Sequence, residues 1–199
     1  SRWIAEMLRL GILPTGHIYP RETRPLRDLL RHRARLVRNR TSRFLTLQNI
    51  LARETGRGVT GNALKRLAIE DLAELGLSRE TNLTLSSSLE VIALLDEKVA
   101  EIEKMVLRGT KARPELKLLR TVGGIGQALG LTILLESGEI ARFRSVGNYV
   151  SYGRLVPTAR RSNERKKGEA NRKNGNPYLS WAFSEAAEFA RRSQPEARR

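Results

Sequence analysis

Ser162 is the residue of this chain whose type and neighbours are best suited to chemistry. It stands in the stretch Arg-Arg-Ser-Asn-Glu-Arg-Lys-Lys (160–167), where five cationic side chains lie within five residues of one hydroxyl. A serine hydroxyl is a weak nucleophile at its free pKa and needs activation. Nearby guanidinium groups would lower that pKa and stabilise a pentavalent phosphoryl transition state. From the chemistry alone, a polar serine in a basic loop is the simpler interpretation.

The composition argues against most other kinds of site. The chain has no cysteine and only two histidines, His17 and His32, which argues against disulfides, thiolate or His-rich metal sites and a Ser-His-Asp triad. It has no apolar run of about 18 residues and no signal-peptide pattern, so we expect a cytoplasmic protein without membrane contacts. A net charge of +16 favours a nucleic-acid partner. The middle third is near neutral and both ends are basic, which suggests two contact surfaces joined by a structural spacer.

A long helix is predicted over residues 24–53. Leu30, Val37, Phe44 and Leu51 recur every seven residues, which is the spacing of one helix face. Between residues 24 and 43 the other faces carry eight arginines with only Asp28 opposing them, a like-charge load that costs stability unless an anion neutralises it. These arginines could form a solvated face, but we favour nucleic-acid contact, with Arg31, Arg35 and Arg38 as the candidates.

A second long helix is predicted from a cap near Ser78 to about Leu107, after a short helix at 63–75. Its apolar residues form a heptad seam of about three repeats, which is long enough for a coiled coil. The seam requires a partner, either the first long helix in an antiparallel helical hairpin or another subunit. The seam residues are Leu85, Ile92, Val99 and Val106.

A glycine turn at 123–126 separates an apolar helix end from a helix predicted over 127–136. The pattern resembles the helix-hairpin-helix motif of DNA-binding proteins. Glycines let a backbone approach a phosphate, and the amides of a helix N-terminus point toward it. We therefore name Gly124 and Gly126 as candidate phosphate contacts. A tight helix–helix corner is an equally good interpretation.

The stretch 154–173 is predicted to be a flexible basic loop that contacts the DNA backbone. It follows a small aromatic group (Phe143, Tyr149 and Tyr152), most simply core, and precedes a helix at 178–192. Its candidate nucleic-acid-binding residues are Arg154, Arg160, Arg161, Arg165, Lys166, Lys167, Arg172 and Lys173.

The order of these segments resembles the transposases of the insertion sequence one-hundred-and-ten family, which are DEDD/serine recombinases guided by a bridge RNA. Residues 114–192 carry the resemblance most closely, and 21–108 look like the family's central spacer. The chain departs from the family at Asn163, where a small residue, usually glycine, is common. The matching motifs are Thr121–Gly126, Glu136–Phe143, Ser151–Pro157, Arg161-Ser162, Lys173–Asn176 and the Ala-rich helix that follows.

The resemblance implies a catalytic role for Ser162, as the serine that attacks DNA and forms a phosphoserine link. It also implies four acidic residues that bind Mg²⁺ in an RNase H-like domain, and these would precede residue 1. No cofactor is then expected in this chain, which would be a truncated transposase with little activity alone. DNA, a structured guide RNA and further copies of the chain, as a dimer or tetramer, are the implied partners.

We therefore expect a mostly α fold: a long helical hairpin or coiled-coil spacer, then a compact helical C-terminal transposase domain with the helix-hairpin-helix-like motif. The expected division is a remnant of the RNase H-like domain and connector at 1–20, the spacer at 21–110 and the serine domain at 111–199. The expected function is DNA binding and strand transfer in transposition. A non-enzymatic nucleic-acid-binding protein that uses the glycine turn and the basic loop is the alternative.

Overall fold

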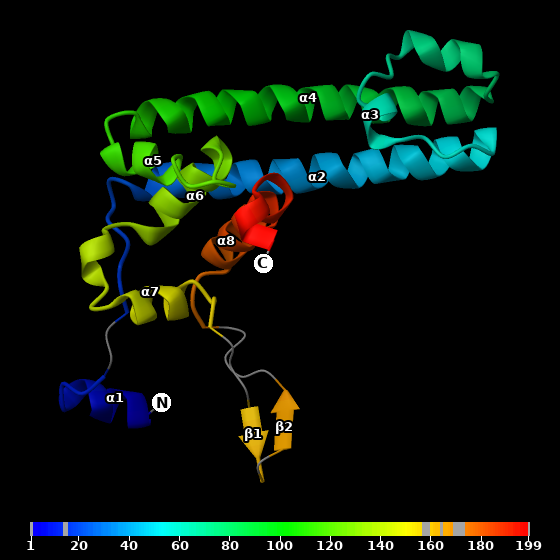
Figure 1. Cartoon of the computed structure of the whole chain (residues 1–199). Coiled ribbons are helices and arrows are strands. Elements are labelled where there is room, and N and C mark those ends of the chain that lie inside the picture. Colours follow the sequence, from blue (N-terminus) through cyan, green and yellow to red (C-terminus); the bar gives the residue numbers. More distant parts are fainter. Residues whose placement is uncertain (1, 14–15, 157–159, 164, 169–173, 199) are drawn as a thin grey trace.

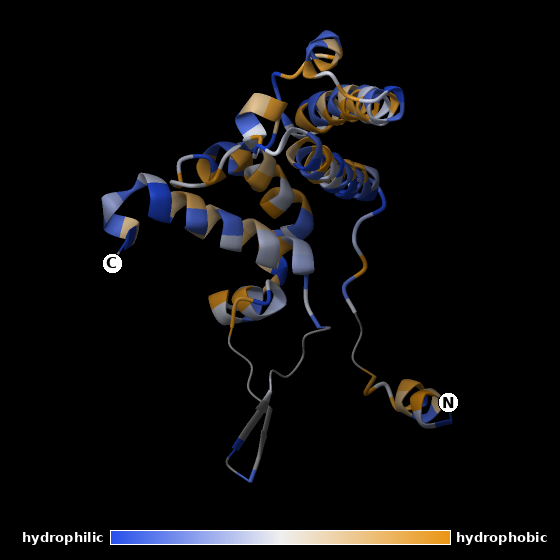
Figure 2. Ribbon diagram, turned by 90° about the vertical axis from the view of Figure 1, so that its right-hand side faces the viewer, coloured by the Kyte–Doolittle hydropathy of each residue, from blue (hydrophilic) through white to orange (hydrophobic). Residues whose placement is uncertain are grey.

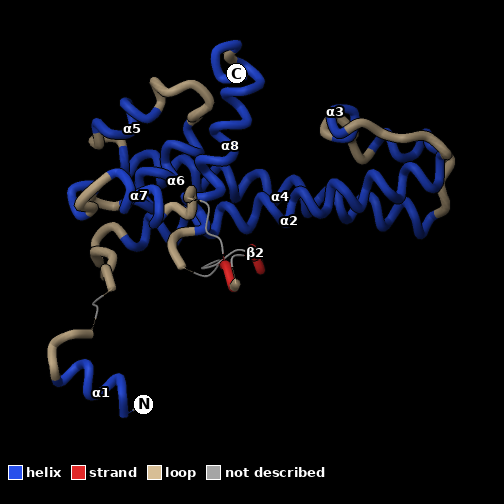
Figure 3. The backbone as a smooth tube through the Cα atoms, turned by 60° about the horizontal axis from the view of Figure 1, so that its bottom comes forward, coloured by secondary structure: helices blue, strands red, loops and turns tan. Residues whose placement is uncertain are grey.

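The computed structural model describes residues 2–13, 16–156, 160–163, 165–168 and 174–198. For Arg160, Arg161, Ser162, Lys166 and Lys167 the description covers the backbone alone. The fold is mostly α, as the sequence predicts, and Figure 3 shows that helices form nearly all of the described regular structure. In chain order the elements are α1 (Arg2–Arg9), α2 (Arg24–Thr55), α3 (Gly61–Leu64), η1 (Glu70–Leu75), α4 (Arg79–Thr110), α5 (Pro114–Leu119), α6 (Gln127–Ser137), η2 (Ile140–Arg142), α7 (Val146–Tyr152), β1 (Arg160–Ser162), β2 (Arg165–Gly168), α8 (Pro177–Ser193) and η3 (Pro195–Arg198).

Helices α2 and α4 form an antiparallel hairpin (Figure 1). All four predicted seam residues of α4 are buried, and residues of α2 such as Leu47 and Leu51 are buried with them. The seam therefore finds its partner within the chain, which is the first of the two predicted alternatives. Ser78 caps α4 as expected, since its Oγ accepts the backbone N–H of Thr81 at 3.1 Å.

The prediction of one helix over 63–75 is wrong, because the segment forms two separate pieces, α3 and η1. Leu64 and Leu72 are both buried in the core cluster that fills the closed end of the hairpin. Between them the chain leaves the helical path, and the Asp71 carboxylate accepts the backbone N–H of Ala68 at 2.8 Å. Burial of both leucines together with this local hydrogen bond favours the interrupted conformation over a continuous helix.

Helix α6 is the centre of the C-terminal half, and every residue from Leu129 to Ser137 is buried. One side packs through Leu131 and Leu135 against α2, α4 and α5 at the open end of the hairpin. The other side packs through Ile133 against α8. A helix that is apolar on all faces is a fully enclosed helix. The core cluster around Leu131 contains residues from both sides of the predicted domain boundary between 110 and 111. The division of the chain into a spacer and a serine domain stays a prediction.

The predicted aromatic group is half-buried, and Tyr149 and Tyr152 pack against the core cluster around Ile133. The Phe143 ring lies 5.0 Å from that of Tyr149 and 5.3 Å from that of Tyr152, measured between centroids. Phe183 of α8 joins the group at 6.1 Å from Tyr149. Burial raises the pKa of the Tyr149 hydroxyl, which shares a 2.8 Å hydrogen bond with Ser137 Oγ.

Helix α1 has no buried residue, and its apolar side chains Trp3, Ile4 and Leu8 are exposed. Figure 2 shows α1 as a helix with hydrophobic residues that stands apart from the other helices. The connector after it is fixed at Tyr19, which is buried and donates its hydroxyl hydrogen bond to the carbonyl oxygen of Leu135. Arg27 of α2 stacks over the Tyr19 ring at 4.2 Å. Among the described residues, no helix combines the length and hydrophobicity needed to cross a membrane.

Candidate nucleic-acid interface

Strands β1 and β2 pair as a short antiparallel hairpin, which we call the basic arm (residues 160–168). The register places Arg161 opposite Lys166 and Ser162 opposite Arg165, with an irregularity next to Arg160. Where it is described, the expected loop is thus a β-ribbon, and the expectation of irregular structure is wrong there. Asn163 adopts φ +52° in the turn, a left-handed conformation that asparagine tolerates better than most residues. This explains how the turn forms without the glycine that is common in the family.

The arm extends away from the helical body, and Ser162 is the last residue of β1, next to the turn (Figure 1). Arg165, its cross-strand neighbour, is exposed. The predicted phosphate contacts Arg172 and Lys173 lie outside the described residues. The basic arm thus places the candidate nucleophile and its neighbouring cationic residues on one projecting element.

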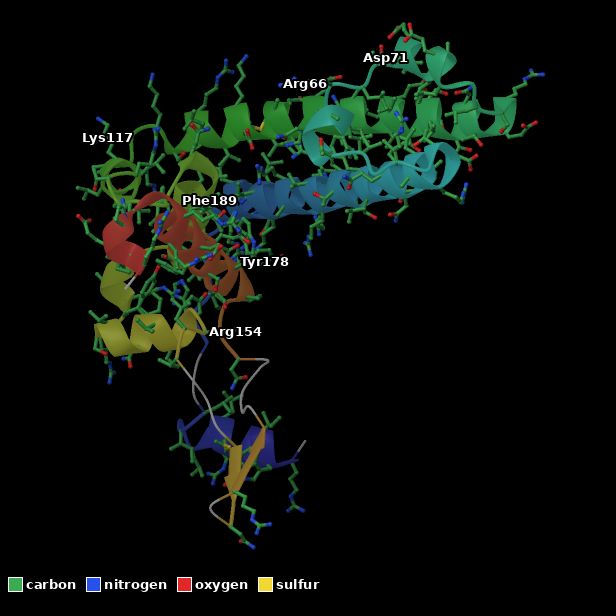
Figure 4. The ribbon with its side chains drawn as sticks, turned by 45° about the vertical axis from the view of Figure 1, so that its right-hand side comes forward. Arg66, Asp71, Lys117, Arg154, Tyr178 and Phe189 are labelled. Atoms are coloured by element: carbon green, nitrogen blue, oxygen red, sulfur yellow. The ribbon has the colours of Figure 1, made fainter. Side chains whose placement is uncertain are left out.

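The base of the arm is closed by hydrogen bonds between the end of α7 and the start of α8. The backbone N–H of Asn176 donates to the Tyr152 carbonyl oxygen at 2.6 Å, and Arg154 Nε donates to the Asn174 carbonyl oxygen at 2.7 Å. Gly175 has φ +85°, and a Cβ there would lie 2.6 Å from the Tyr152 carbonyl oxygen. Glycine is therefore required at this crossing. Figure 4 shows Arg154 at this position, between α7 and the arm.

The buried carboxylate of Glu136 connects this base to the long hairpin, a role that was not predicted from the sequence. Glu136 is 2% exposed and lies near the end of α6. Its Oε1 accepts Arg31 Nε at 2.5 Å, and its Oε2 accepts Arg31 Nη2 and Asn176 Nδ2, both at 2.7 Å. Asn176 Oδ1 in turn caps α8 by accepting the backbone N–H of Tyr178 at 2.9 Å. The sequence does contain one indication of this role, a single acidic residue at the end of an apolar helical segment. Such a residue needs a cationic partner when it is buried.

Arg31 consequently has an internal partner, which departs from its predicted role as a phosphate contact. The hydrogen bonds that Arg31 donates to the Glu136 carboxylate raise the pKa of the Arg31 guanidinium, which also stacks over the Tyr178 ring at 4.5 Å. Arg33 pairs with Glu103 at 2.6 Å, and Arg40 pairs with Asp96. Asp28 is the one acid opposing these arginines within their own span, but acids far away in the sequence pair with several of them in the fold.

Arg35 and Arg38 differ from these paired arginines. Both are exposed on α2. Arg38 Nε donates to the Ala34 carbonyl oxygen at 3.3 Å, and Arg35 approaches the His32 ring at 3.4 Å. Neither contact neutralises a positive charge, so these two residues stay candidates for phosphate contact.

The glycine turn serves mainly helix packing, which favours the helix–helix corner at Gly124. This residue has φ +86°, and a Cβ there would lie 2.2 Å from the Ala186 carbonyl oxygen of α8. Gly126 differs: it precedes α6 without a side-chain cap, and a Cβ there would meet no atom within 4 Å. Gly126 borders a shallow hollow of about 600 Å³ that Arg120 and Gln127 also line. The amides at the α6 N-terminus are therefore the part of the motif still suited to an anion.

We expect Gly124→Ala to destabilise the fold by several kcal/mol, because the added Cβ would clash with the backbone of α8 and alanine would have to adopt a strained φ. Gly126→Ala is the matched control, with an expected change within about 1 kcal/mol because its backbone angles suit any residue. Urea unfolding of both variants measures the difference. Equal stability of the two would show that α8 does not pack on Gly124 as described.

The comparisons with known proteins bear on this half of the chain. Residues 116–199 match the family model described as Transposase IS116/IS110/IS902 family. No curated protein matches the chain. The matched segment runs from α5 through the basic arm to the C-terminal residue and does not include α2 or α4. The match supports a transposase role and agrees with the resemblance found in the sequence. Among the described residues, no three acidic or histidine side chains gather into a cation site.

Proposed function

We propose that this chain is the DNA-binding and strand-transfer part of an insertion-sequence transposase. The observation that carries the proposal is the basic arm, a projecting β-ribbon rich in Arg and Lys that lies inside the segment matching the transposase family model. A two-stranded ribbon fits the dimensions of a DNA groove. Cations along both strands suit the phosphates on either side of it.

Two further surfaces support the arm in this proposal. Arg35 and Arg38 add exposed cations on α2. Gly126 has no side chain, so the backbone amides at the α6 N-terminus can contact an anion. A structured guide RNA, implied by the family resemblance, would use the same chemistry, because RNA presents the same phosphates. Recognition of the DNA sequence would then depend on base pairing with the guide RNA, since phosphate contacts do not distinguish bases.

Ser162 is the proposed nucleophile. Its Oγ would form a bond to the scissile phosphorus while the bond from phosphorus to one deoxyribose oxygen breaks. The hydroxyl proton leaves to solvent or a base, and the departing oxygen takes up a proton. The neighbouring cations of the arm would stabilise the charge on the phosphoryl oxygens. The Mg²⁺ that the family resemblance implies would be held by the acidic residues of an RNase H-like domain.

Salt dependence of DNA binding tests the proposal. We expect the logarithm of the association constant to fall linearly with the logarithm of salt concentration, with a slope of about −0.9 per phosphate contacted. Replacing Arg160, Arg161, Lys166 and Lys167 together by alanine should reduce the slope by about 3 to 4 and weaken binding equally for unrelated sequences. Fluorescence anisotropy with labelled duplexes over a salt series gives both quantities.

A quadruple variant in the connection from α2 to α4 controls for net charge. Arg57, Lys65, Arg66 and Arg79 are exposed there, outside the arm. Figure 4 shows Arg66 beside α4, far from the arm. Their replacement by alanine removes the same formal charge and should change the slope by less than about 1. A salt slope near zero for the unaltered chain would refute nucleic-acid binding, and equal effects of both variants would refute the role of the arm.

A further inference from the structure

Helices α2 and α8 meet where an arginine stacks on an aromatic ring. The Arg31 guanidinium of α2 lies 4.5 Å from the centre of the Tyr178 ring, at the start of α8, and Figure 4 labels Tyr178 there. From this contact α8 runs away from the long hairpin (Figures 2 and 3). One face of α2 and one flank of α8 therefore form an open angle, which we call the α2–α8 corner (Arg35, Arg38, Tyr178 and Trp181).

The α2 side of the corner carries positive charge. Arg35 and Arg38 follow Arg31 after four and seven residues, so all three lie on one face of α2. The contact between Arg31 and Tyr178 turns this face toward α8. Arg35 and Arg38 are exposed, and the contacts described above leave both charges unneutralised. This side is therefore suited to phosphate groups.

The α8 side of the corner carries an exposed aromatic ring. Trp181 follows Tyr178 by three residues and so lies one turn further along the same flank of α8. The opposite flank, with Leu179 and Ala182, is buried against α6. Trp181 is 42% exposed, although its ring gains much from burial. Glu185, half-buried one turn beyond Trp181, repels phosphate, so this side is suited to a flat ring.

We propose that the α2–α8 corner binds unpaired nucleotides of a DNA strand, with a base stacked on Trp181 and the adjoining phosphates on Arg35 and Arg38. A single strand presents bases on one side and phosphates on the other, as the two sides of the corner require. Aromatic stacking combined with cations along the backbone is how proteins hold single strands without reading their sequence. The bases of a duplex are stacked between neighbouring pairs, so they offer Trp181 no free face.

This inference rests on the proposed function. A strand that is transferred to a new position must leave its complement, so unpaired bases arise during the reaction. The corner would hold such a strand, while the basic arm contacts the phosphates of the duplex.

The surroundings of Trp181 favour a nucleotide over a protein partner. Ser184 and Glu185, its neighbours on α8, are polar. Phe189, the other exposed large apolar residue of α8, borders the hollow at the α6 N-terminus instead. One ring among polar and cationic groups suits a nucleobase, whereas a protein interface buries a larger apolar patch.

The fluorescence of Trp181 tests the proposal. Trp3 and Trp181 are the two tryptophans of the chain, so Trp3→Phe leaves Trp181 as the sole reporter. A dT oligonucleotide of about 12 nucleotides should quench its emission, because a stacked base contacts the indole ring. The same strand annealed to dA should bind without comparable quenching.

Substitutions measure the two sides of the corner separately. Trp181→Leu should weaken binding of the single strand about tenfold or more, and binding of the duplex less than about twofold. Trp181→Phe keeps a ring and should recover much of that loss. Replacing Arg35 and Arg38 together by alanine should reduce the salt slope for the single strand by about 1.4, since each phosphate contact contributes about 0.7. Fluorescence anisotropy of labelled oligonucleotides gives these affinities.

Trp3→Leu is the matched control, because Trp3 is an exposed tryptophan on α1. It should leave both affinities unchanged, and equal melting temperatures should show that the fold persists in all variants. Single-strand binding that neither quenches Trp181 nor weakens in Trp181→Leu would overturn this inference and leave the proposed function intact. Tighter binding and stronger quenching by an rU oligonucleotide would also overturn it, by assigning the corner to RNA. The lack of salt-dependent binding to either single strand or duplex would refute the proposed function and this inference with it.

Discussion

Ser162→Ala is expected to abolish the covalent protein–DNA product while leaving DNA affinity within about twofold. The substitution removes one oxygen atom and no charge, so the phosphate contacts of the arm persist, whereas no phosphoserine bond can form. Ser162→Cys should retain a trace of product, since a thiolate is a competent nucleophile at an electropositive site. The loss in Ser162→Ala should be complete, because a covalent step has no substitute for its nucleophile.

Denaturing electrophoresis of the protein with labelled DNA measures this product. The assay uses Mg²⁺ and a protein that also carries the acidic RNase H-like domain that the family resemblance implies. Ser151→Ala is the matched control, because Ser151 is an exposed hydroxyl on α7 outside the arm. An adduct that survives in Ser162→Ala would assign the nucleophile elsewhere. Salt-dependent binding by a protein that never forms an adduct would favour the non-enzymatic alternative.

The long hairpin could be predicted from sequence because its core repeats. Leu85, Ile92, Val99 and Val106 occupy one face at a fixed interval, and all four are buried. Ser78 marks the start of α4 through a cap that needs only local residues. Periodicity and capping are properties of a single helix, so they can be recognised in the sequence without knowledge of the tertiary structure.

The basic arm could not be predicted as a β-ribbon for an equally physical reason. Its strands comprise three and four residues, Arg160–Ser162 and Arg165–Gly168, and lack the alternation of apolar and polar residues that identifies a strand. Turn-forming and cationic residues there are equally typical of a loop. The ribbon depends on backbone pairing and on the left-handed turn at Asn163, neither of which leaves a hydrophobic pattern.

The pairing of Arg31 with Glu136 could not be predicted from local sequence either, because 105 residues separate the two. Within the sequence of α2 alone, too few acidic residues are present to neutralise its arginines. Folding brings Glu136 from α6 and Glu103 and Asp96 from α4 against that helix. The roles of these arginines are consequently divided, with some holding the fold together and others exposed for a ligand.

Arg31→Ala is expected to lower the free energy of unfolding by about 3 to 5 kcal/mol, the usual cost of leaving one member of a buried ion pair without its partner. Glu136, at 2% exposed, would keep only the amide of Asn176 among the hydrogen-bond donors that contact its carboxylate in the described structure. Because Asn176 also caps α8, the loss should extend to the base of the arm. Urea unfolding followed by circular dichroism measures the change.

Arg38→Ala is the matched control, one exposed arginine replaced on the same helix. It should change stability by less than about 0.5 kcal/mol, yet weaken DNA binding if its charge faces phosphate. A double variant, Arg31→Leu with Glu136→Leu, should recover much of the lost stability, since it leaves no unpaired carboxylate in the core. If Arg31→Ala were no more destabilising than Arg38→Ala, the ion pair would not hold α6 and α8 to the hairpin. Arg31 would then return to the set of candidate phosphate contacts.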